Sequence, residues 1–300
     1  MLKSLQKAFK VKEVRDRLLY TFMMLVVIRI GCCLPIPGVD PSYLHDFFSN
    51  LQNSGMGFFN AITGGSFSSM SIFALSITPY ITSSIIMQLL TIAIPKLEEM
   101  QKDGEDGRKK IAEYTRYLTV GLALFESCAM AVGLGGKGLL LEDHRNIWGY
   151  LTVVAAMTAG SALLMWIGER ITDNGVGNGI SIVLLINIVS GTPQDMMTLY
   201  ERFMAGRSVA VATVSGIIVL AIIVAIVVFV LVLNDAERRI PVQYSKKMQG
   251  RRMIGGQSTY IPLKVNTANV IPVIFASSIM SMPVMIAQFF HVDYSTIGGK

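Results

Sequence analysis

The sequence predicts an all-α membrane protein, a bundle of helices that crosses a bilayer several times. Hydrophobic residues make up 52% of the chain and charged residues only 15%, whereas a soluble domain has about 25% charged residues. The hydrophobic residues gather in blocks of about 20, the length that a helix needs to cross the hydrocarbon core. The basic residues gather between alternate blocks, as is typical of cytosolic loops.

We predict seven spans, of which 209–233 is the clearest because it is apolar on every side. Most of the 26 Lys and Arg residues fall before the first span, after the second and after the sixth. The positive-inside rule therefore puts the N-terminus in the cytosol and Lys300 outside. The seven spans are 18–36, 71–94, 117–135, 148–168, 178–192, 209–233 and 268–290.

The first span has the basic start of a cleavable signal, but Arg29 interrupts its apolar run and PIPG follows it. A signal would end in a small-x-small cleavage site. We therefore predict a retained span. Two charges fall within spans, Arg29 in the first and Glu126 in the third, at similar depth. Intramembrane charges are functional candidates, and we hypothesise that these two form an ion pair.

The second span is the most polar. Pro79 removes one backbone donor and can kink this helix. Two interpretations stay open: a packed interior helix whose hydroxyls bond to backbone, or a helix lining an aqueous path with an apolar constriction. A polar stripe of Ser69, Ser76, Tyr80 and Ser83 neighbours an apolar stripe of Ile77, Ile81 and Ile85.

Two further segments are unusual for membrane spans. Residues 58–70 are uncharged, too short to span and too apolar for a solvated loop. They fit equally a re-entrant element buried in protein and an interfacial turn. The fifth span starts with a glycine-rich segment, predicted to be flexible, and places Ile180 and Leu184 on one helix face. That segment contains Gly175, Gly177 and Gly179, and Asn178 and Asn187 are polar residues of this span.

A basic loop leads into a polar seventh span. Polar groups in hydrocarbon must be satisfied by protein or water, so this span is expected to face other helices or an aqueous path. The loop is then a surface for a partner. The polar and proline residues are Asn266, Thr267, Asn269, Pro272, Ser277, Ser278, Ser281 and Pro283.

The sequence contains no P-loop, HExxH, GxSxG or CxxC motif. Cys32, Cys33 and Cys128 lie in or beside apolar spans, without the spacing of a metal site or a disulfide framework. We therefore predict no enzyme, cofactor or metal, but a conduit or a scaffold. A secondary transporter with broken helices is the alternative, favoured by Pro79 and the glycines. Such a transporter would normally have a binding site with charged groups at the middle of the membrane, and the sequence shows none. A structural scaffold would need no apolar constriction.

Four stretches resemble signature sequences of the SecY family, the channel subunits of the Sec protein translocase. They occur in order and in register with the predicted spans. The resemblance implies a channel of ten spans in two inverted five-helix halves, which passes unfolded preproteins and releases membrane helices into lipid. The stretches are SIFALSITPYITSSIIMQLL, EDGRKKIAEYTRYLT, WIGERITDNGVGNGISI and QSTYIPLKVNTANVIPVIFASSI.

The resemblance also assigns residues to roles. It implies a pore ring of Ile77, Ile81, Ile180, Leu184 and Ile274, where Leu184 replaces an expected isoleucine. It favours re-entry for 58–70, as a plug with Phe59, Asn60, Thr63, Gly64 and Gly65. It implies a lateral gate with Ser83, Gln88, Asn266, Ser277 and Ser278. It implies a docking surface with Arg238, Arg239, Lys246, Lys247, Arg251 and Arg252.

The implied partners are the small membrane subunits SecE and SecG, the SecA motor ATPase, the ribosome with its RNA, preproteins and lipid. The implied location is a bacterial plasma membrane. The segments would be a cytosolic stretch (1–17), a first half (18–205) and the start of a second (206–300) with a cytosolic loop (234–266). Three spans are missing, so we expect a truncated chain. Glu126 is a second departure, an acid where an uncharged polar residue is expected.

Overall fold

The computed structural model describes residues 11–40, 63–134, 140–141, 145–242, 247–249, 252–254, 259–267, 276 and 279. The chain forms two compact units. Unit 1 comprises Met1–Pro193 and Phe275–Lys300, and unit 2 comprises Gln194–Ile274.

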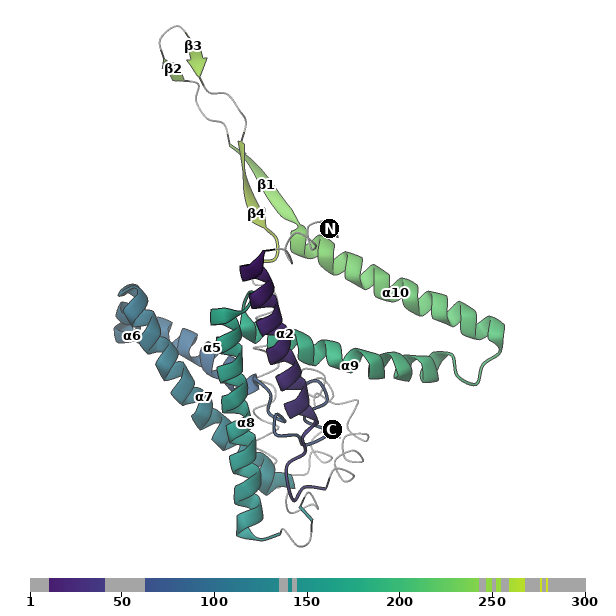
Figure 1. Ribbon diagram of the computed structural model, residues 1–300. Helices are drawn as coiled ribbons and strands as arrows, with labels where there is room; N and C mark the ends of the chain where they lie inside the picture. The colour runs from purple at the N-terminus through teal and green to yellow at the C-terminus, as the bar shows by residue number, and fades with distance from the viewer. Residues whose placement is uncertain are drawn as a thin grey trace, which may run out of the picture. The chain divides into compact units, whose positions relative to one another are not determined.

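Unit 1 is helical. α7 and α8 lie side by side, α5 packs on α7, and α2 packs on α8 (Figure 1). A bend of 103° separates α5 from α6, because Pro95 begins α6 and holds Ile94 in an extended conformation. The helices are α2 (Lys12–Cys33), α5 (Thr78–Ala93), α6 (Pro95–Lys102), α7 (Glu105–Leu134), α8 (Ile147–Asn174) and the first part of α9 (Gly179–Phe203).

Residues 63–77, here called the turn segment, precede α5 as a series of turns. Met70 and Ser76 have φ angles of +41° and +52°, which no right-handed helix tolerates. The predicted start of the second span at residue 71 is therefore wrong, and its polar stripe is not one helix face. Pro79 lies in the first turn of α5, where a missing N–H costs no hydrogen bond. It starts this helix and does not kink it.

The turn segment is held beside the end of α2 by backbone hydrogen bonds. The Ile36 N–H donates to the Met70 carbonyl at 3.0 Å, and the Ile72 N–H donates to the Leu34 carbonyl at 3.0 Å. Most side chains of the segment are buried. Irregular backbone at membrane depth occurs only where protein or water satisfies its polar groups, and these bonds meet part of that need.

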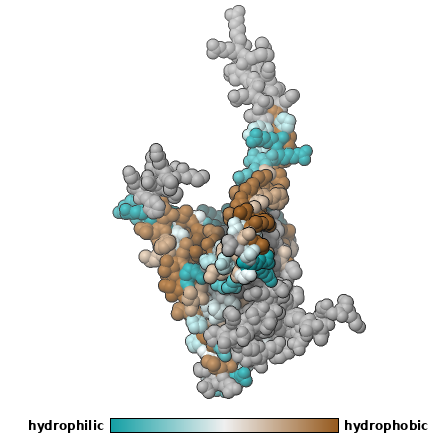
Figure 2. Space-filling model, turned by 90° about the vertical axis from the view of Figure 1, so that its right-hand side faces the viewer, coloured by the Kyte–Doolittle hydropathy of each residue, from teal (hydrophilic) through white to brown (hydrophobic). Residues whose placement is uncertain are grey.

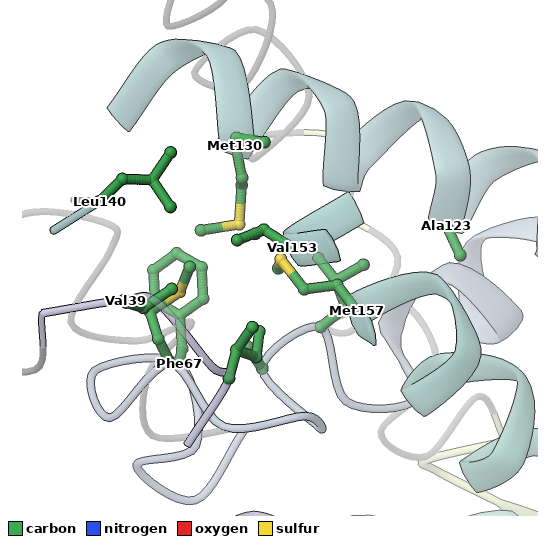
Figure 3. Packing of buried hydrophobic residues seen from close by; sticks show 12 residues of the cluster. Val39, Phe67, Ala123, Met130, Leu140, Val153 and Met157 are labelled. Atoms are coloured by element: carbon green, nitrogen blue, oxygen red, sulfur yellow. The ribbon is translucent and has the colours of Figure 1, made fainter. Parts of the chain in front are cut away.

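The core of unit 1 contains a first apolar cluster, in which the turn segment packs between α7 and α8. Figure 3 shows Phe67 of this segment and Val39 beside Met130 of α7 and Met157 of α8. The cluster consists of Ile36, Val39, Phe67, Met70, Ala74, Leu75, Ala123, Met130, Ala131, Leu140, Val153 and Met157.

Unit 2 contains the end of α9 and all of α10 (Val209–Asp235). α9 was predicted to end at residue 192, but it continues through Pro193 to Phe203. Three described helices are long and apolar enough to cross a membrane, and the bent pair α5–α6 is a fourth candidate. The predicted first and third spans correspond to α2 and α7, whose N-terminal turns carry charges. Of the seventh, only residues 276 and 279 are described.

The predicted basic loop contains strands that the sequence did not indicate. β1 (Glu237–Val242) pairs antiparallel with β4 (Thr259–Lys264), and β2 (Lys247–Gln249) pairs antiparallel with β3 (Arg252–Ile254). Pro241 and Pro262 lie within β1 and β4, and a two-stranded ribbon tolerates proline because each strand has a free edge. The all-α fold class applies to the membrane part.

Candidate functional site

A second apolar cluster joins four helices and the turn segment of unit 1. Its buried centre includes Ile77, and Ile81, Ile180 and Leu184 pack against that centre. Four of the five predicted ring residues therefore lie in one cluster, while Ile274 is outside the described residues. The buried members are Ile28, Cys32, Phe73, Ile77, Leu164, Ile167, Ile171 and Val183.

Gly168 of α8 is the point where the end of the turn segment and the start of α9 come together. A Cβ atom at this glycine would lie 3.4 Å from Ile180 Cγ1 and 3.6 Å from Ile77 Cδ1. A Cβ at Gly179 would lie only 1.9 Å from the Gly168 carbonyl oxygen. The two glycines thus let the start of α9 approach α8 closely enough for the isoleucines to meet.

The glycine-rich start of α9 was predicted to be flexible, but it is a hydrogen-bonded turn. Asn178 Oδ1 accepts hydrogen bonds from the N–H groups of Ile180 (3.0 Å) and Ser181 (3.4 Å), as an N-cap residue does. The Val176 N–H donates to Thr21 Oγ1 of α2 at 3.2 Å. This turn is therefore tied to the N-terminal helix, a contact that the sequence did not reveal.

A polar junction, defined as Ser76, Ser161 and Asn187, borders the second apolar cluster. Asn187 Nδ2 donates to Ser76 Oγ at 3.0 Å, and Ser161 Oγ donates to the Ser76 carbonyl at 3.3 Å. All three residues are about 1% exposed. Within the part of the chain that the structure describes, Asn187 Oδ1 has no hydrogen-bond partner. The sequence indicated a polar residue at 187 but not its contact with the turn segment.

Of the predicted plug residues, Thr63, Gly64 and Gly65 belong to the turn segment, while Phe59 and Asn60 lie outside the described residues. Thr63 is fully buried. Gly64 has a φ of +66°, and a Cβ there would lie 2.6 Å from the Asn187 carbonyl oxygen. Only glycine fits this approach to α9. Thr63 and Gly64 are therefore packed against protein, whereas a Cβ at Gly65 would meet nothing within 4 Å. The role of these residues as a plug stays a prediction.

The predicted lateral-gate residues are divided between the two units. Ser83 of α5 faces α7, where its Oγ lies 2.5 Å from Thr119 Oγ1. Gln88 is exposed on α5. Asn266 follows β4 in unit 2 and is half-buried. Ser277 and Ser278 lie outside the described residues, so the gate stays a prediction.

The hypothesised Arg29–Glu126 ion pair is absent, and this prediction was wrong. Glu126 is buried with its Oε2 unpartnered, and Arg29 Nη1 also lacks a hydrogen-bond partner. The reason is the packing, because α2 packs on α8 and Glu126 belongs to α7.

α7 is instead joined to α8 by Arg116 and Glu169, whose Nε and Oε1 atoms lie 2.7 Å apart. The hydrogen bond to Glu169 raises the pKa of Arg116, so this side chain stays charged at any usable pH. The sequence could have suggested this pair, since both residues lie at the predicted cytosolic ends of neighbouring spans.

The predicted docking residues lie partly on strands. Arg238 and Arg239 are exposed on β1, and the Arg239 guanidinium lies 4.7 Å from the centroid of the Tyr260 ring. Lys247 is on β2 and Arg252 on β3. In Figure 2, hydrophilic surface gathers where Figure 1 shows β1 and β4. Lys246 and Arg251 lie outside the described residues.

The described part of the chain has no group of three His, Cys, Asp or Glu side chains that could hold a metal ion. Its cysteines are free, with Cys32 buried and Cys33 exposed. The distinctive feature of this site is therefore apolar: side chains from separate helices that meet beside a buried polar junction.

Apolar helices of spanning length that converge on an aliphatic cluster define a polytopic membrane protein. The SecY family model matches residues 71–299. The chain belongs to the SecY family. This confirms the resemblance noted in the sequence.

Curated relatives are named protein translocase subunit SecY. The one from Streptomyces scabiei is 46% identical over 301 residues, covering 96% of this chain and 68% of the relative. The one from Corynebacterium glutamicum is 44% identical over 294 residues, covering 95% and 65%. The one from Pseudomonas aeruginosa is 42% identical over 278 residues, covering 93% and 62%. The chain thus spans about two thirds of these relatives.

Solved structures share the fold. A protein-conducting channel matches with a TM-score of 0.55 at 21% identity, covering 92% of this chain and 59% of that one. A SecY structure, whose plug domain is described as stabilising the closed channel, matches with a TM-score of 0.57 at 20% identity, covering 92% and 58%. Sec61 from a canine ribosome-channel complex matches with a TM-score of 0.52 at 21% identity, covering 92% and 59%.

Proposed function

We propose that this chain belongs to the channel subunit of a Sec translocase, which passes unfolded preproteins across a membrane and releases apolar helices into lipid. The second apolar cluster is the observation that carries the proposal. Side chains from α5 and α9, far apart in sequence, meet there with aliphatic surfaces and no charge. An apolar constriction excludes ions because water leaves it. It also yields to polypeptides of any sequence, since it offers no specific polar contact.

Photocrosslinking tests this proposal directly. A photoactivatable amino acid at Ile77 or Ile180 should form adducts with a preprotein arrested during export. The matched control is Leu185, which is on α9 next to Leu184 but 61% exposed. Adducts at the two cluster positions and none at Leu185 are expected. Equal labelling at all three positions, or none anywhere, would contradict the channel.

Residues 58–70 are proposed to act as the plug. The packing of Phe67 and Met70 against α7 and α8, and the close approach of Gly64 to α9, support this role, as does the plug domain described for the SecY structure of similar fold. The proposed lateral gate comprises Ser83, Gln88, Asn266, Ser277 and Ser278. A crosslinker at Gln88, which is exposed on α5, should capture signal sequences before they reach lipid.

The basic strands β1 to β4 are proposed as the docking surface for a cytosolic partner, the SecA motor or the ribosome. Clustered Lys and Arg residues suit acidic protein surfaces and RNA phosphates, and a structure of similar fold is a ribosome-channel complex. The basic loops favour a cytosolic position for this surface and for the N-terminus. The proposed location is a bacterial plasma membrane, with SecE and SecG as membrane partners. These partners and this orientation are part of the proposal.

Charge reversal tests the docking surface. Lys247→Glu with Arg252→Glu should weaken binding of purified SecA or ribosomes to proteoliposomes, about tenfold at low salt. Membrane insertion should not change. The control is Lys96→Glu with Lys102→Glu, which makes the same charge change on α6. Equal losses for both pairs would show a general charge effect and not a docking site.

A further inference from the structure

We infer that Asn187 is a positioning residue, which holds the apolar constriction closed through its hydrogen bond to Ser76. The inference rests on the proposed channel function and goes beyond it. The first step concerns Ser76, whose φ of +52° is left-handed. A residue with a Cβ rarely keeps this conformation unless its surroundings hold it there.

Two helices hold Ser76. Asn187 of α9 donates to its hydroxyl at 3.0 Å, and Ser161 of α8 donates to its carbonyl at 3.3 Å. The first bond joins residues 111 positions apart in sequence. Because all three residues are buried, water does not compete for these bonds. The conformation of Ser76 therefore depends on α8 and α9 staying in place.

The polar junction is coupled to the constriction through the chain itself. Ser76 directly precedes Ile77, so the backbone turn at Ser76 sets where Ile77 points. On α9, residues Ile180, Leu184 and Asn187 are spaced i, i+4 and i+7, which puts them on one helix face. The Asn187–Ser76 bond therefore links α9, with Ile180 and Leu184, to the turn segment, which carries Ile77 and continues into α5.

Asn187 uses only half of its amide. Its Nδ2 donates to Ser76, but its Oδ1 is buried without a partner among the described residues. A buried unpaired acceptor destabilises the state that contains it. When the constriction widens, water or a backbone N–H of a passing polypeptide can reach Oδ1. The same side chain thus stabilises the closed state through its donor and favours opening through its acceptor, so closure is reversible.

Ion conductance of the resting complex tests this inference. The complete complex in liposomes, without substrate, should leak ions about three- to tenfold more with Asn187→Ala or Ser76→Ala, the effect of losing one buried hydrogen bond. The double variant should leak no more than the worse single variant, because both remove one interaction. Ser76→Gly should leak less than Ser76→Ala, since glycine adopts the left-handed conformation freely.

Ser181→Ala is the matched control. It removes a hydroxyl from the exposed side of α9, so its leak should equal that of the parent. Additive leaks in the double variant, or an equal leak in Ser181→Ala, would overturn the inference. Thermal unfolding of each variant separates channel opening from misfolding. A leaky variant that is correctly folded should unfold at a midpoint temperature within a few degrees of the parent.

A native thiol gives a readout that does not depend on channel activity. Cys32 is 5% exposed and packs in the second apolar cluster with Phe73 and Ile77. In a background of Cys33→Ser and Cys128→Ser, a membrane-permeant maleimide should label Cys32 faster in Asn187→Ala than in Ser181→Ala. Equal labelling rates with equal leaks would overturn the role of Asn187. If Ile77 and Ile180 formed no photocrosslinks with an arrested preprotein, the proposed channel function alone would be overturned.

Discussion

Gly160 of α8 sets the distance between this helix and the turn segment. A Cβ atom at Gly160 would lie 2.0 Å from the Ile72 carbonyl oxygen, and no side-chain rotation relieves a clash with backbone. Glycines at such positions permit close approach of two backbones. The position is therefore sensitive to any added atom.

Gly160→Val should destabilise the protein by about 3 kcal/mol, the upper range for overpacking. Thermal unfolding in detergent measures the effect. Gly121→Ala on α7 is the control, because a Cβ there meets nothing within 4 Å. It should be neutral or stabilise the helix by about 0.5–1 kcal/mol. Equal destabilisation by both changes would refute the packing of α8 on the turn segment.

Glu126 is the one acidic residue buried within a predicted span. Its Oε2 has no partner, and a buried charge without a partner is costly. Glu126→Gln should therefore leave the unfolding midpoint unchanged or raise it, whereas Glu113→Gln on the exposed side of α7 should do nothing. A loss of about 3 kcal/mol, as on breaking a buried ion pair, would reveal a cationic partner and restore the Arg29 hypothesis.

At the scale of single elements, the β1–β4 ribbon depends on contacts between its strands. Arg239 lies over the Tyr260 ring, a cation–π contact of about 0.5–1 kcal/mol when exposed. Tyr260→Ala should speed amide hydrogen exchange in β1 several-fold, whereas Tyr260→Phe, which keeps the ring, should not. Equal exchange in both variants would show that the strand backbone alone holds the ribbon.

The helices that the sequence predicted best are those with a uniform apolar pattern, such as 209–233, which became α10. The sequence failed where backbone conformation outweighed hydrophobicity. Residues 71–77 are apolar enough for a span, but the left-handed Ser76 prevents a helix there. The loop 234–266 was predicted from its basic residues, and no pattern in it indicated the ribbon that Pro241 and Pro262 join.

The sequence predicted the parts of the site that depend on local helix spacing, but not the contacts between distant segments. Ile180 and Leu184 share a helix face by spacing alone, but only the resemblance suggested that they belong with Ile77. The Asn187–Ser76 bond joins positions 111 residues apart, and no local pattern in one sequence encodes such a contact. The Arg29–Glu126 hypothesis failed similarly, since equal depth does not establish that two helices are neighbours.

For the whole molecule, the helices differ in how much of their surface is available to lipid. In the most apolar window of α8, 44% of residues are buried, whereas in that of α10 none are. Broad hydrophobic surface is visible in Figure 2. A lipid-borne carbene reagent in liposomes should therefore label α10 on every side and α8 on one side only. Periodic labelling of α10 would show that another helix covers it.

The long separation between Ser76 and Asn187 has a consequence for biosynthesis. Chains grow at about 5–20 residues per second, so Ser76 is made roughly 6–20 seconds before Asn187, which is 111 residues later. During that interval Ser76 lacks the side chain that holds its hydroxyl. The turn segment can thus form its backbone hydrogen bonds to the residues after α2 before α9 exists. The order of synthesis makes its contact with α9 a later event than its contact with the end of α2.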